Sequence, residues 1–157
     1  MGLFDGISKK QHALNEEIDT QHALATIILG SVYADNWESQ EENLVLRQIL
    51  SKSPIFANSS EEGDRLIIER SKSFLKNTLG ALDTACSVLT PPLKATAFAM
   101  ATEIVFADGL IDPQEAQFIE SLRSKLGLSE SFGKAVVETF DALYRDLDEH
   151  TTEGASE

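Results

Sequence analysis

The sequence contains a single cysteine, Cys86, and no uninterrupted run of about 18 apolar residues. One cysteine excludes an intrachain disulfide, which fits a reducing compartment. The missing apolar run argues against a membrane-spanning helix. The first residues show neither the basic segment nor the apolar core of a secretory signal. We therefore expect a cytoplasmic protein that does not insert into a membrane.

Positive charge is also scarce, with 13 Lys and Arg residues against 26 Asp and Glu and a formal net charge of -13. A strongly acidic chain repels phosphate backbones and other oxyanions, so nucleic acid is not expected as a partner. Five of the acidic residues follow Arg145, where no Lys or Arg occurs and apolar periodicity stops. We expect a single domain over residues 1–147 and a disordered acidic tail over residues 148–157.

Strand signals are missing, and apolar residues recur at the three- and four-residue spacing of helices. Residues that cap helices mark the boundaries of six or seven such segments. The expected helices run from an N-cap at Thr20 to about Ala34, from a capping box at Ser39 to Pro54, from a capping box at Ser59 to near Gly80, from Ala81 to about Leu89, from Leu93 to Ala107 after an N-cap at Thr90 and a proline at Pro91, from an N-cap at Asp112 to Gly127, and from Ser129 to Leu147. The segment from Leu93 to Ala107 is apolar on nearly every side, which predicts a buried central helix.

The chain contains an internal repeat. Residues 32–42 align without gaps with residues 105–115, at an offset of 73. Each copy has the end of one helix, a turn of Ala-Asp-Gly type and the capped start of the next helix. The matched pairs are Val32 and Val105, Tyr33 and Phe106, Ala34 and Ala107, Asp35 and Asp108, and Glu42 and Glu115. We therefore expect an all-α bundle of two helix–turn–helix halves, related by an approximate twofold axis around the buried central helix.

The second copy resembles the signature of the TerB family of tellurite-resistance proteins. That signature is Ala-Asp-Gly, an acidic N-cap and a glutamate three residues later, here Ala107-Asp108-Gly109, Asp112 and Glu115. The first copy is less similar, because Asn36 replaces the glycine and Ser39 the acidic cap. The resemblance spans residues 20–147. It implies a TerB-like helical bundle with a role in tellurite and oxidative stress, divalent-metal binding through the acidic turns, and assembly with a TerC-type membrane protein.

The acidic turns supply candidate ligands for calcium or magnesium, which prefer several converging oxygen atoms. The candidates are Asp35, Glu42, Asp108 and Glu115, with Glu103 and Asp112 as additional ligands. An EF-hand is rejected, because its first two ligand positions would be the apolar Ile104 and Phe106. In the alternative interpretation, Asp108 satisfies amides of its loop and Glu115 closes a capping box onto Asp112. The two interpretations are compatible.

Two other residues stand out. Glu103 is the only charged residue between Lys94 and Asp108, on a helix expected to be buried. It is either an internal metal or proton ligand, or it lies in a groove between helices and pairs with a Lys or Arg. Trp37 follows the first turn and is either a staple on the next helix or an exposed anchor for a partner protein.

No His-Glu-x-x-His motif or glycine-rich phosphate loop occurs, and Cys86 is expected to be an inert core thiol. We therefore expect a non-enzymatic stress-response protein that docks a partner, with a divalent cation at the acidic turns. One alternative is a metal-free interaction scaffold. Another is a metal-assisted hydrolase that uses Glu103. A further alternative is a homodimer that pairs an apolar helix face of each chain.

Overall fold

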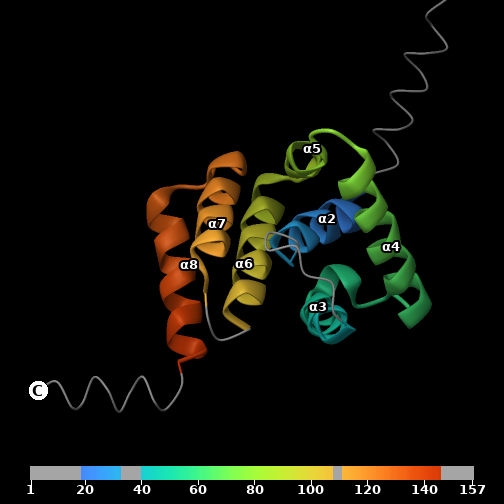
Figure 1. The fold of residues 1–157 in the computed structure, drawn as a ribbon, viewed down its shortest axis with the longest axis horizontal. Helices are drawn as coiled ribbons and strands as arrows, with labels where there is room; N and C mark the ends of the chain where they lie inside the picture. Colours follow the sequence, from blue (N-terminus) through green and yellow to red (C-terminus); the bar gives the residue numbers. More distant parts are fainter. Residues whose placement is uncertain (1–18, 33–39, 108–110, 146–157) are drawn as a thin grey trace, which may run out of the picture.

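The computed structural model of the chain describes residues 19–32, 40–107 and 111–145, and residues 40–45 without their side chains. The described residues form seven α-helices, one short 3-10 helix and no strand, so the predicted all-α bundle is confirmed (Figure 1). The elements are α2 (Thr20–Val32), α3 (Gln40–Lys52), η2 (Pro54–Phe56), α4 (Glu61–Asn77), α5 (Ala81–Val88), α6 (Pro91–Ala107), α7 (Pro113–Lys125) and α8 (Glu130–Leu143).

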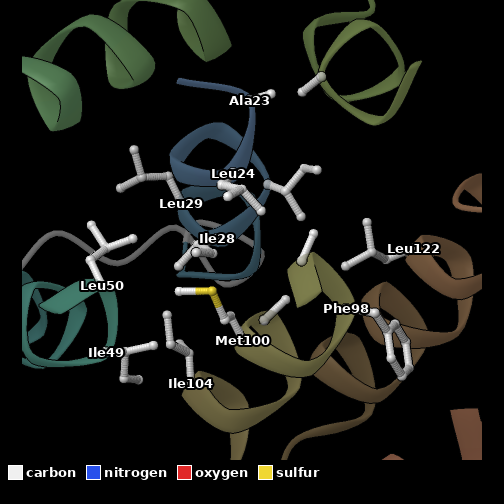
Figure 2. Packing of buried hydrophobic residues seen from close by; sticks show 14 of the residues in the cluster. Ala23, Leu24, Ile28, Leu29, Ile49, Leu50, Phe98, Met100, Ile104 and Leu122 are labelled. Atoms are coloured by element: carbon white, nitrogen blue, oxygen red, sulfur yellow. The ribbon is translucent and has the colours of Figure 1, made fainter. Parts of the chain in front are cut away.

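Helix α2 lies at the centre of the bundle. Seven consecutive residues, 23–29, are buried, and no charged side chain interrupts them. The helix packs mainly against α4, α5 and α6, and also contacts α3 and α7 (Figure 1). Leu24, Ile28 and Leu29 point from α2 toward the surrounding helices (Figure 2). A helix that is apolar all round is stable only when neighbours cover every side, which explains this position.

Helix α6 was predicted to be the buried central helix, and the structure corrects this in part. Its buried residues include Phe98, Ala101 and Ile104, but its first turn is exposed or half-buried. The most deeply buried position belongs to α2, and α6 packs beside it. The core is therefore built around a pair of apolar helices rather than around one.

The internal repeat corresponds to equivalent helices. Helix α3 spans residues 40–52 and helix α7 spans residues 113–125, so both of their boundaries differ by the 73 residues of the sequence offset. The helices that precede the two turns, α2 and α6, pack against each other. The third helix of each half, α4 or α8, packs against the apolar helix of its own half. In each half, the apolar helix thus packs against the third helix of its own half and against the apolar helix of the other half.

Several predicted helix boundaries are confirmed at the level of the capping atoms. The Asp112 side chain caps α7 with Pro113 at its first position, and the Ser129 side chain caps α8 by accepting a hydrogen bond from Phe132 N. Gly127 has a φ of 67°, the left-handed conformation that glycine adopts without strain after a helix. Pro91 begins α6, as its place after Thr90 predicts.

Other boundaries were predicted wrongly by a residue or more. Asp19, not Thr20, caps α2, because its Oδ1 atom accepts the hydrogen bond from His22 N at 3.0 Å. Ser60, not Ser59, caps α4 through Gly63 N, so the expected capping box does not form there. In both places two neighbouring residues are good caps, so the sequence alone leaves the boundary open by one residue. Helix α2 is described only to Val32, so its predicted end near Ala34 lies outside the described residues.

The predicted boundary between two helices near Gly80 is confirmed. Helix α4 ends at Asn77, and Gly80, with a φ of 70°, turns the chain before α5 begins at Ala81. At the other end of the chain, α8 stops at Leu143 rather than Leu147, and the predicted tail lies outside the described residues. Among the described helices, none is both long enough and apolar enough to cross a membrane.

We expect Leu24→Ala to lower the free energy of unfolding by about 2–5 kcal/mol, because it leaves a cavity in the fully buried centre of α2. Denaturant unfolding followed by circular dichroism measures the change. Leu66→Ala is the matched control, since Leu66 of α4 is 50% exposed and its loss should cost less than about 1 kcal/mol. Equal losses in the two variants would contradict the central position of α2.

Candidate functional site

The structure describes the side chains of three of the seven residues predicted to form a site. Asp35, Trp37 and Asp108 lie outside the described residues, and Glu42 lies in α3 at a position whose side chain is not described. The metal and partner predictions for these four residues therefore stay predictions. The three predicted site residues with described side chains are Glu103, Asp112 and Glu115.

Asp112 and Glu115 form a complete capping box at the start of α7. Glu115 N donates to Asp112 Oδ1 at 2.8 Å, and Asp112 N donates to Glu115 Oε2 at 3.2 Å. Glu115 is only 6% exposed, so its carboxylate needs such donors to stay charged. The start of a helix also favours negative charge, because the peptide dipoles and free N–H groups point toward it. The capping role of Glu115 is thus confirmed, and it fixes both carboxylates directly after the acidic turn.

Glu103 lies where α3, α6 and the end of α8 meet. Its Oε1 atom accepts a hydrogen bond from the Tyr144 hydroxyl at 2.9 Å and lies 3.5 Å from Lys52 Nζ. The Glu103 side chain is 16% exposed and that of Lys52 is 66% exposed, so the carboxylate is largely covered and its cation lies on the solvent side. This confirms the interpretation in which Glu103 pairs with a Lys between helices. Its described contacts fit a structural role and give no support to the hydrolase alternative.

Tyr144 is a site residue that the sequence did not reveal. It is the C-cap of α8, and 41 residues separate it from Glu103. No local pattern signals so distant a pair. Burial raises the pKa of the Tyr144 hydroxyl, and the hydrogen bond to Glu103 raises it further. Both effects favour the neutral hydroxyl, which is the form that donates to a carboxylate.

Two further aromatic rings, Phe140 and Phe106, follow the Tyr144 ring in a row of ring contacts. The Tyr144 ring centroid lies 6.4 Å from that of Phe140, and Phe140 lies 6.5 Å from Phe106 of α6. Tilted ring pairs at this spacing attract through their quadrupoles in addition to burying area. The Glu103 cluster (Lys52, Glu103 and Tyr144) is therefore the polar edge of an aromatic contact between α6 and α8.

The predicted inert thiol is consistent with the structure. Cys86 is buried in α5, and burial together with the nearby Asp83 carboxylate raises its pKa to about 11. A thiol of this kind is almost entirely protonated at neutral pH and is a poor nucleophile.

An open depression between α3 and α4 is lined by charged side chains, with Arg47 Nη1 3.3 Å from Glu61 Oε1. These groups neutralise each other at the surface.

Large exposed apolar side chains gather on one helix. Within the described ranges, Phe132, Leu143 and Tyr144 are exposed on or next to α8, whereas Leu66, Leu79 and Ile111 are exposed singly elsewhere. Between Phe132 and Leu143 the exposed residues include Ala135, Thr139 and Ala142, spaced at three and four along the helix. These five residues of α8 form a continuous row of low polarity, the α8 flank, which the sequence analysis did not single out.

No protein-family model matches the chain, and neither the curated proteins nor the solved structures provide a significant match. Within residues 19–32, 40–107 and 111–145, no three His, Cys, Asp or Glu side chains gather so that they could share a metal ion. The turns that contain Asp35 and Asp108 lie outside these ranges.

We expect the Tyr144 hydroxyl to titrate above the ordinary tyrosine value of about 10. Ultraviolet absorbance of the phenolate in a Tyr33→Phe background reports Tyr144 alone, because the chain has two tyrosines. The unfolded chain loses this proton near the ordinary value and the folded chain only at higher pH. The free energy of unfolding should therefore be constant below the ordinary tyrosine pKa. It should fall as the pH rises from that value through the higher pKa of Tyr144 in the folded chain. Adding Tyr144→Phe should remove this fall, and an ordinary titration would contradict the Glu103 contact.

Proposed function

We propose that this protein is a non-enzymatic, TerB-like stress-response protein of the cytoplasm that acts by docking a partner protein. The α8 flank is the observation that carries the proposal. A row of exposed Phe, Leu, Ala and Thr side chains on one helix is the kind of surface that protein partners cover. The resemblance of residues 107–115 to the TerB signature supports the biological context.

The α8 flank has the features of a surface for a partner helix. Phe132 and Leu143 stand at its ends, three turns apart, and the small side chains of Ala135, Thr139 and Ala142 leave room between them. An apolar helix laid along this row would bury the two large residues and approach the α8 backbone closely. A TerC-type membrane protein is the first partner to test, because the family resemblance implies it.

Co-purification with a co-expressed TerC-type protein tests the docking proposal. We expect Ala135→Glu and Leu143→Glu each to reduce the captured partner at least about tenfold, since each places a charge in the interface. Leu66→Glu is the matched control, because it puts the same charge on an exposed leucine of α4. Circular dichroism checks that all three variants are folded. Undiminished capture by both α8 variants would contradict docking through α8.

A divalent cation at the acidic turns is the second candidate, and the Asp112–Glu115 capping box favours it. The box places two carboxylates at the start of α7, immediately after the turn that contains Asp108. Carboxylates held rigidly beside an acidic turn lower the entropy cost of assembling oxygen ligands. Asp35 and Glu42 of the first half would complete the set if the two turns meet.

Calorimetric titration of chelator-treated protein with calcium and with magnesium measures this binding. We expect micromolar affinity for one of the ions, weakened about tenfold or more by Asp108→Asn, which removes one charged ligand. Asp83→Asn is the control, since Asp83 of α5 pairs with Lys125 in the last turn of α7, at the opposite end of that helix from the capping box. If neither ion gives a measurable heat of binding, the metal is removed from the proposal and partner docking stays in place.

A further inference from the structure

Helix α8 is held to the bundle by few buried groups. All of its residues are described, and Gly133 alone among them is fully buried. By contrast, α2 buries eight of its thirteen residues. The main contacts of α8 are with α6 and α7, on one side only. Because apolar burial is the largest stabilising contribution in a fold, α8 should have a lower local stability than the centre of the bundle.

The first turns of α8 are nevertheless fixed to α7. Arg123 Nη1 donates to the Leu128 carbonyl at 2.7 Å, and Leu128 N donates to the Arg123 carbonyl at 3.1 Å. A Cβ atom on Gly133 would lie 2.6 Å from Arg123 Cδ, so the α8 backbone rests directly on this side chain. Phe132 also packs near Phe98, with ring centroids 6.3 Å apart. The helix is therefore anchored at its beginning.

The last turns of α8 have a different kind of attachment. Phe140 contacts Phe106 of α6, and the Tyr144 hydroxyl donates to Glu103. Leu143, between these contacts, is 68% exposed, and Ala142 is exposed as well. One aromatic contact and one hydrogen bond to a carboxylate are the described side-chain interactions that hold this end, with Val137 half-buried beside them. Both attach to a single helix, α6, within one turn of its end.

We propose that residues 137–144 open from α6 as a unit around the anchored first turns of α8, and that the Tyr144–Glu103 hydrogen bond is the latch that keeps them closed. Opening separates Phe140 from Phe106 and releases Glu103 from its hydroxyl donor. It uncovers Glu103 and Phe106 at the end of α6. The opening is a property of the protein alone and does not depend on the proposed partner.

Such an opening couples two surfaces of the molecule. The α8 flank includes Leu143 and Ala142, which move with the opening segment, and Glu103 and Phe106 form the surface of α6 that the segment covers. A ligand that prefers the closed or the open arrangement at either place shifts the same equilibrium. The latch is therefore a conformational device that links the α8 flank to the end of α6.

Native-state hydrogen exchange measured by NMR tests the latch. In the wild-type protein, we expect the amides of residues 140–144, including Tyr144 N, to exchange much faster than those of α2. Tyr144→Phe keeps the ring and removes only the donor. We expect it to speed exchange of residues 140–144 about tenfold, while residues 134–136 and α2 change less than about twofold. Glu103→Gln replaces the charged acceptor and should act on the same amides.

The control variant is Glu138→Gln, which removes a carboxylate from α8 whose partner, Lys134, is fully on the surface. It should leave all of these exchange rates within about twofold. The proposal is overturned if residues 140–144 exchange as slowly as α2. It is equally overturned if Tyr144→Phe and Glu103→Gln accelerate all helices alike, or if neither variant accelerates the end of α8 more than the control does.

Discussion

The fold depends on one constraint, that the apolar surface of α2 must be covered on every side. A buried helix has no solvent face to orient it, so its position is defined only by the helices around it. Here α4, α5 and α6 supply most of that cover, with α3 and α7 completing it. Among them, α3, α4, α5 and α7 each have one apolar side, turned toward α2 or α6, and one polar side. The placement of every other helix follows from this arrangement, and α8 is the helix farthest removed from it.

Local chemistry made much of the fold predictable. Hydrophobic spacing located every described α-helix, and Ser129, Pro91, Gly127 and the Asp112–Glu115 box marked boundaries that the structure confirms. The errors arose where two residues competed for one role, as with Ser59 and Ser60. The central position of α2 was also missed, although residues 20–32 contain no Asp, Glu, Lys or Arg and α6 contains Lys94 and Glu103. Burial depends on contacts between distant segments, and a single sequence does not encode these in any local pattern.

The candidate site was predictable to a smaller extent. The capping role of Glu115 follows from a four-residue pattern, and the structure confirms it. The unusual placement of Glu103 on an apolar helix signalled a partner, yet Lys52 and Tyr144 are 51 and 41 residues away. The α8 flank was missed because exposed alanine and threonine residues look ordinary in a sequence. They gain meaning only once the buried side of the helix is known.

The equivalence of the two halves has a consequence for how the chain can be divided. Each half contains one strongly apolar helix, α2 or α6, and covers part of it with the other half. A fragment cut between α5 and α6 would leave a wide apolar strip on α2 facing water. Two copies of such a fragment would bury these strips against each other, just as the joined halves do now. The covalent link therefore turns an association between separate units into an intramolecular contact that no longer depends on protein concentration.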